Sequence, residues 1–174
     1  MSAPLRAPVL AAGTWRVDDG RTRVAFAVRN FGFVVHGTVA CAAGEVELDG
    51  AGRPVRARAR LDLTSVATGI ARRDLDLRKP SLLDIDRHPE MTWSAHRFTP
   101  APDGGWRADG VLAVRGTSAP LTLVGTPEAA GQDGACIRVR ATGELDRATV
   151  GIRVPSLVIG RRVVVTVDAW LSRS

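Results

Sequence analysis

Residues 55–63, VRARARLDL, alternate without a break between apolar and charged side chains. Every odd position is apolar, and every even position is charged, three times by arginine and once by Asp62. Successive side chains of a β-strand point to opposite faces, so a period of two predicts a strand with one buried and one solvated face. Such strands are typical of antiparallel sheets that have water on one side.

Strand-like runs recur along the chain, at residues 22–29, 33–41, 45–48, 91–98, 106–115, 121–126, 137–142 and 162–171. Turn-forming clusters of Gly, Asp and Pro separate them, at residues 18–20, 49–52, 102–105 and 131–134. Eight or nine strands joined by short turns predict an all-β, antiparallel barrel or sandwich.

The expected inner faces carry small residues, namely Ala57, Ala59, Ala108, Gly110 and Ala141. An eight-stranded barrel is just wide enough to be filled by side chains or to hold one small ligand. Small inward residues favour the hollow form. The alternative is a flattened sandwich in which Ala and Gly let two sheets approach closely.

Residues 69–88 are too rich in arginine and aspartate to continue the sheet. Asp74 and Arg78 have the spacing of a pair on one helix face, and Pro80 should end that helix. The sequence SLLD at 81–84 has the spacing of a capping box for a second short turn. We therefore expect a broken helical lid over one end of the barrel.

The chain has a formal charge of +6 and a pI near 11.0, with Lys79 as its only lysine. This balance indicates affinity for anions such as phosphates, nucleic acid or an acidic membrane face, but scattered arginines also suit an ordinary solvated surface. There is no tyrosine, and most of the four tryptophans and four phenylalanines occupy core-like positions. Binding of single-stranded nucleic acid needs stacking aromatics beside a basic groove, so we expect no nucleic-acid partner.

Cys41 and Cys136 are not at zinc-ligand spacing, and we expect two buried thiols, with one disulfide as the alternative. Residues 1–12 lack the apolar core of a secretory signal, and no run approaches the roughly 20 apolar residues of a membrane span. We expect a cytoplasmic protein without stable membrane insertion. Residues 1–12 would form a flexible leader and residues 13–174 a single barrel domain.

No nucleotide-binding loop, nucleophile elbow or zinc-protease motif is present, so we predict no catalytic residue, metal or cofactor. Asp84, Asp86 and His88 are the nearest approach to a metal cluster, and we expect them to shape the lid instead. The adjacent pair Asp146 and Arg147 is expected to fix a turn by bonding to the backbone. Basic lid residues would either hold an anionic head group or pair with nearby aspartates, namely Arg72, Arg73, Arg78, Lys79 and Arg87.

Several motifs occur in an order that resembles the YceI-like family, the bacterial polyisoprenoid-binding barrels. They are TWRVD at 14–18, VAFAVRNFGFVVHG at 24–37, LDLTSVATGIARRD at 61–74, the segment 77–93, DGVLAVRGT at 109–117, and DR at 146–147 followed by GI at 151–152. The resemblance implies an eight-stranded, lipocalin-like barrel that holds a long isoprenoid chain and forms a homodimer. The chain departs from the family pattern in three places, with Asn30 in place of His, Ser81-Leu82-Leu83 in place of aromatic or large apolar residues, and Val150 in place of Phe.

We therefore predict a non-enzymatic protein that binds, stores or carries an amphipathic isoprenoid lipid, either a polyprenyl phosphate or a quinone-like molecule. The candidate ligand-binding residues are Asn30, Phe31, Phe33, Ala57, Ala59, Leu75, Arg78, Leu82, Leu83, Trp93 and Arg147. The alternatives are a barrel enzyme that acts on a small apolar substrate, and a stress-related barrel that binds a partner protein without a lipid.

Overall fold

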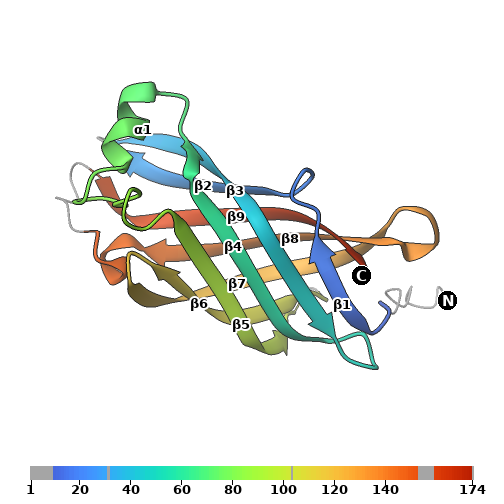
Figure 1. Cartoon of the computed structure of the whole chain (residues 1–174). Helices are drawn as coiled ribbons and strands as arrows, with labels where there is room; N and C mark the ends of the chain where they lie inside the picture. Colours follow the sequence, from blue (N-terminus) through green and yellow to red (C-terminus); the bar gives the residue numbers. More distant parts are fainter. Residues whose placement is uncertain (1–9, 31, 103, 153–158, 174) are drawn as a thin grey trace.

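The computed structural model describes residues 10–30, 32–102, 104–152 and 159–173. These residues form an elongated antiparallel barrel (Figure 1). Its strands are β1 (Gly13–Val17), β2 (Arg23–Asn30), β3 (Phe33–Leu48), β4 (Pro54–Ala67), β5 (Glu90–Pro100), β6 (Trp106–Val114), β7 (Thr117–Ala130), β8 (Cys136–Asp146) and β9 (Ile159–Arg173). The remaining elements are the helix α1 (Ala71–Leu77) and two short 3₁₀ turns, η1 (Gln132–Gly134) and η2 (Arg147–Val150).

Nine strands fill eight positions around the barrel because β1 and β2 share one position. Both strands lie between β3 and β9, β1 at one end and β2 at the other. The turn between them is tied to β9, since the Asp18 amide donates to the Trp170 carbonyl at 2.7 Å and the Trp170 amide donates to Thr22 Oγ1 at 3.0 Å. Pairing of β3 with β4 closes the barrel, which confirms the predicted eight-stranded fold.

The side chains of β4 alternate between buried and exposed as predicted, but the spacing of the buried residues changes near the end of the strand. Leu61 and Leu63 are buried two residues apart, whereas the next buried residue, Val66, lies three further on. The pairing with β3 shifts register here, and Ser65 Oγ accepts the amide of Ala40 at 2.8 Å in place of a backbone partner. Such a bulge increases the local twist, which helps a long strand to coil around a closed barrel.

Several strands, among them β3 and β7, are longer than predicted. β3 runs unbroken through the small residues that the sequence pattern assigned to a gap between two runs. β7 contains Pro120 and Pro127, which lie just outside the predicted run at residues 121–126. Pro120 pairs only with β6 and Pro127 only with β8. A proline lacks the amide that a strand paired on both sides would need, so the stagger of the barrel accommodates both.

The lid contains one helix, and the predicted second helical turn is wrong. After α1, residues 78–87 form hydrogen-bonded turns, in which the amides of Leu82 and Asp84 both donate to the Lys79 carbonyl, at 2.9 and 3.0 Å. Asp84 has φ of 49°. This left-handed conformation stops a right-handed helix from continuing.

The predicted pairing of Asp74 with Arg78 is also wrong. The Asp74 carboxylate accepts the amide and the hydroxyl of Thr68, at 2.9 and 2.7 Å. Arg78 instead pairs with Asp86 at 3.4 Å. Asp74 therefore ties the start of the lid to the end of β4.

On the outer wall, Arg138 and Asp168 form a bidentate ion pair. Arg138 Nε donates to Asp168 Oδ1 at 2.9 Å, and Nη2 donates to Oδ2 at 2.7 Å. The hydrogen bond from Arg138 holds the pKa of the Asp168 carboxyl below its usual value. We expect Asp168→Asn to lower the free energy of unfolding at pH 7 by about 0.5–1 kcal/mol, because the pair is partly exposed.

Because the folded-state pKa of Asp168 is depressed, its stabilising effect is present above the unfolded pKa of about 3.9 and is lost as the pH falls through the lower folded value. Urea denaturation at pH 7 and below pH 3 measures this. A stability difference between wild type and Asp168→Asn that is the same at both pH values would contradict it.

Candidate ligand-binding cavity

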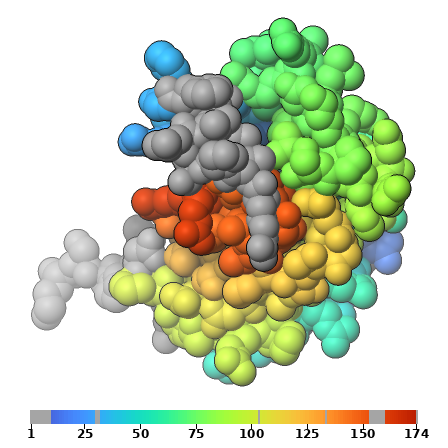
Figure 2. Space-filling view, turned by 90° about the vertical axis from the view of Figure 1, so that its left-hand side faces the viewer, coloured from blue at the N-terminus to red at the C-terminus, as the bar shows by residue number. Residues whose placement is uncertain are grey.

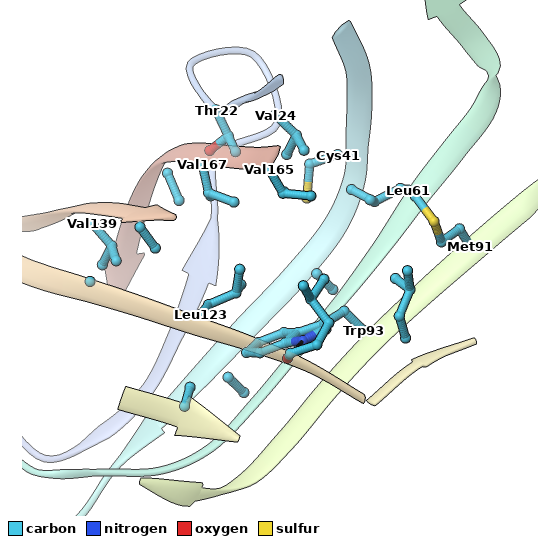
Figure 3. A pocket seen from close by; sticks show the side chains of 18 of the residues that line it. Thr22, Val24, Cys41, Leu61, Met91, Trp93, Leu123, Val139, Val165 and Val167 are labelled. Carbon is cyan, nitrogen blue, oxygen red and sulfur yellow. Dashed lines mark hydrogen bonds between the residues drawn. The ribbon is translucent and has the colours of Figure 1, made fainter. Parts of the chain in front are cut away.

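An elongated cavity of about 370 Å³ runs through the barrel. Its wall extends from Leu77 and Leu83 of the lid to Pro54 and Trp106 at the opposite end, and all nine strands contribute to it. The wall is almost entirely apolar, as the close-up view shows (Figure 3). Known small-molecule pockets are roughly 300–1,000 Å³ and largely apolar, so the barrel is hollow and of ligand-binding size.

Two aromatic rings lie flat on glycines of the wall instead of crossing the lumen. A Cβ atom at Gly37 would overlap the ring of Phe26, its cross-strand partner. A Cβ atom at Gly110 would likewise overlap the indole of Trp93. Trp93 also donates its ring N–H to the Leu121 carbonyl at 2.9 Å, so its polar edge is satisfied within the wall. The glycines thus keep space open along the barrel axis.

The polar groups of the wall are also satisfied internally. Thr22 Oγ1 bonds to the backbone of Trp170. Cys41 donates its thiol to the Ala43 carbonyl at 3.4 Å, and burial raises its pKa, so the sulfur is a neutral, apolar group at pH 7. Cys41 and the half-buried Cys136 are both free, which excludes the disulfide alternative in this structure.

Arg147 places a guanidinium at the lid end of the cavity. It is only 4 % exposed and lies in the wall. Its Nε donates to the Gly160 carbonyl at 3.1 Å, and its Nη1 donates to the Ile152 carbonyl at 2.9 Å. The neighbouring Asp146 accepts the Ala148 amide at 2.9 Å. The pair thus fixes the turn between β8 and β9 through the backbone, as the sequence predicts.

The lid covers its end of the barrel with apolar side chains. Leu77, Leu82 and Leu83 line the cavity, and Ile85 is 1 % exposed within the main core. Figure 2 shows this end of the molecule, with the lid in green. The apolar residues of the lid therefore close the lumen, and of the charged lid residues only Asp84 is buried.

Arg115 connects the lid to the opposite side of the same barrel end. Its Nη2 donates to the Pro80 carbonyl at 2.8 Å, and its Nη1 donates to the Gly151 carbonyl at 3.1 Å. Arg115 and Gly116 form the turn between β6 and β7, with φ of 55° and 69°. A two-residue turn with positive φ at both positions favours Asn or Gly, so an arginine here is strained and its contacts compensate.

We expect Arg115→Asn to loosen the lid, because asparagine suits the turn but cannot reach Pro80 or Gly151. Amide hydrogen exchange across residues 82–88 should rise about tenfold or more, with a loss of overall stability near 1 kcal/mol. The control is Arg107→Asn, which breaks an exposed ion pair with Asp109 on the barrel wall. Unchanged exchange in the lid of Arg115→Asn would show that Arg115 does not hold it.

Six of the predicted ligand-binding residues line the cavity, namely Ala57, Ala59, Leu82, Leu83, Trp93 and Arg147. Phe33 and Leu75 do not, since they are 77 % and 66 % exposed. Arg78 lies in a shallow surface depression and pairs with Asp86. Asn30 is the last residue of β2, and Phe31 lies outside the described residues.

Sequence reasoning missed several lining residues, among them Phe26, Met91, Leu112 and Leu121. These residues occupy the inward-facing positions of strands with alternating side chains, and this alternation could have identified them. It also missed Arg115, for which the signal was an Arg-Gly pair between two strand-like runs.

The lid carboxylates do not converge. His88 Nε2 lies 4.0 Å from Asp84 Oδ2, whereas the Asp86 side chain is 83 % exposed and faces Arg78. Among the described residues, no group of His, Cys, Asp and Glu has the arrangement of a metal site. In the same part of the chain, no helix is both long and apolar enough to cross a bilayer.

The sequence profile of the YceI-like domain matches residues 15–171, nearly the whole barrel. The chain belongs to the YceI-like family. No curated protein matches its sequence significantly.

Solved structures share the fold of this YceI-like domain. BcnA from Burkholderia cenocepacia superposes with a TM-score of 0.76 at 16 % identity, covering 88 % of this chain and 98 % of BcnA. A Saccharophagus degradans structure, described as a polyisoprenoid binding domain implicated in plant cell wall breakdown, gives 0.66 at 14 % identity, over 92 % and 98 % of the two chains. The Campylobacter jejuni YCEI protein gives 0.67 at 17 % identity, over 74 % and 79 %.

Proposed function

We propose that this protein is a non-catalytic carrier or reservoir for an amphipathic isoprenoid lipid. The observation that carries the proposal is the long, almost entirely apolar cavity along the barrel axis. Burying apolar surface stabilises a complex by about 25 cal/mol per Å², so such a lumen favours a long hydrocarbon chain over a polar substrate. The polyisoprenoid binding domain named for the Saccharophagus degradans structure supports an isoprenoid as the class of ligand.

In this proposal the tail lies in the lumen against Ala57, Ala59 and Trp93, beneath Leu82 and Leu83. The head group lies at the lid end. Arg147 places a positive charge there, so we favour a polyprenyl phosphate over a quinone. Contacts of Asn30, Phe31 and Arg78 with the head group are also proposed.

A chain-length series tests the function. Farnesyl, geranylgeranyl and longer polyprenyl phosphates are titrated into the protein while tryptophan fluorescence is followed, since Trp93 lies in the wall. We expect one molecule to bind and each added isoprene unit to tighten binding about tenfold or more until the lumen is full. An affinity independent of chain length, or no binding, would contradict the proposal. Quinones with prenyl tails of the same lengths are titrated in the same way, and the difference in affinity measures the contribution of the phosphate.

The cytoplasmic location and the homodimer stay predictions. Fractionation of the producing cells and light scattering of the purified protein test them.

A further inference from the structure

We propose that the lid end of the barrel docks on the surface of an anionic lipid bilayer. The proposal goes beyond lipid carriage and does not depend on it, because it concerns the outer surface and not the cavity. Three observations support it. Exposed apolar side chains gather at this end, several lid arginines have no ion-pair partner in the described part of the chain, and the nearby carboxylates are bonded within the lid or buried.

Exposed large apolar side chains concentrate at this end. Among the described residues, the three most exposed are Phe33, Leu75 and Val34, at 77 %, 66 % and 54 %, and Ile70 follows at 49 %. Other exposed apolar side chains, such as those of Val111 and Val124, are scattered over the barrel wall. Exposed apolar groups that gather in one place mark an interaction surface, whereas single ones need no explanation.

The exposed groups come from two segments that share the rim. Thr38 pairs with Ala67, which places the start of β3 beside the connection from β4 to α1. Figure 2 shows the β2–β3 corner in blue and the lid in green at the same end. Phe33 is in phase with the inward-facing residues of β3, yet it is exposed because it projects beyond the closed part of the barrel.

The lid also presents arginines that form no ion pair within the described residues. Arg72 and Arg87 are exposed and Arg73 is half-buried, and none has a hydrogen-bond or ion-pair partner among the described residues. On the barrel wall, Arg58 pairs with Glu45 and Arg60 with Glu90, whereas Arg23 and Arg97 likewise have no such partner among the described residues. The lid thus exposes arginines that are free to meet an anionic surface.

The lid carboxylates are occupied within the lid. Asp74 is bonded to Thr68, Asp76 pairs with Lys79 at 2.7 Å, and Asp86 pairs with Arg78. Asp84 is buried. Apolar side chains flanked by free arginines complement a bilayer, where the apolar groups enter the interface and the arginines meet lipid phosphates.

Vesicle co-sedimentation of the full chain tests the proposal. Vesicles of phosphatidylcholine alone are compared with vesicles of equal parts phosphatidylcholine and phosphatidylglycerol. We expect binding to the anionic vesicles that weakens as salt is raised. Arg72→Glu with Arg87→Glu should weaken it by about 30-fold, and Phe33→Ser with Leu75→Ser by about tenfold.

Matched variants on the wall are the controls. Arg23→Glu with Arg97→Glu reverses two exposed wall arginines, and Val111→Ser with Val124→Ser removes two exposed wall valines. Both should bind vesicles within about twofold of wild type. Equal losses in lid-end and wall variants would overturn the proposal, because they would show only a general charge effect.

Two further outcomes would overturn it. One is wild-type protein that does not bind anionic vesicles. The other is a dimeric wild-type protein that does not bind vesicles and that becomes monomeric in the Phe33→Ser, Leu75→Ser double variant. In that case a second copy of the chain, and not a bilayer, would cover this surface. Ala59→Trp, which obstructs the lumen, should still bind vesicles, so failure of docking and failure of lipid carriage are distinguishable.

Discussion

Ala59→Trp is expected to weaken binding of the isoprenoid ligand strongly while the barrel stays folded. Ala59 lies in the cavity wall and pairs with Trp93 across β4 and β5. An indole at this position would project into the lumen that the ligand must occupy. If it denies the chain about 120 Å² of apolar burial, at about 25 cal/mol per Å², binding weakens by about 3 kcal/mol, or more than 100-fold.

The measurement is the titration with polyprenyl phosphate, with circular dichroism to verify the fold. Thr92→Trp is the matched control, because it adds the same side chain to the exposed face beside Arg60. That variant should bind like wild type. Val165→Trp on β9 repeats the test from another strand should Ala59→Trp fold poorly. Normal affinity in a folded Ala59→Trp protein would show that the ligand does not enter the lumen.

Arg147→Ala is expected to destabilise the protein by about 3 kcal/mol. The substitution removes a buried side chain and leaves the partly buried carbonyls of Ile152 and Gly160 without these donors. A fully buried polar group that loses its partner costs roughly 1–3 kcal/mol. Arg147→Lys should recover less than half of the loss, because one ammonium cannot replace a planar guanidinium that bonds in several directions.

Urea denaturation measures the free energy of unfolding for each variant. Arg161→Ala is the control, since Arg161 is exposed and pairs with Asp146 at the same turn. Its loss should stay below about 1 kcal/mol. If Arg147→Ala and Arg161→Ala cost the same, the buried guanidinium does not hold the β8–β9 turn.

The barrel could be predicted because each strand can be recognised from the alternation within its own short run of residues. The alternation over residues 55–63 shows which side chains face inward, and the small residues among them favour a lumen. Leu82 and Leu83 were found as lining residues because a lid has to present apolar groups to the barrel that it covers.

The remaining features depend on distances along the barrel axis and on contacts between loops. Alternation places Phe33 on the inner face of β3, but it does not show where the barrel ends, so Phe33 lies at the rim instead of in the cavity. Leu75 follows the helix pattern, yet it is exposed to solvent on the short helix α1. Arg115 joins Pro80 to Gly151 across the fold, and no local pattern contains that information.

The most direct test of lipid carriage is the native mass spectrum of protein purified without detergent. We expect an excess mass of one bound molecule that organic extraction removes, a prenyl lipid in the extract, and no excess mass in Ala59→Trp. A spectrum with only the mass of the polypeptide, from protein that also takes up no polyprenyl phosphate when it is supplied, would contradict it.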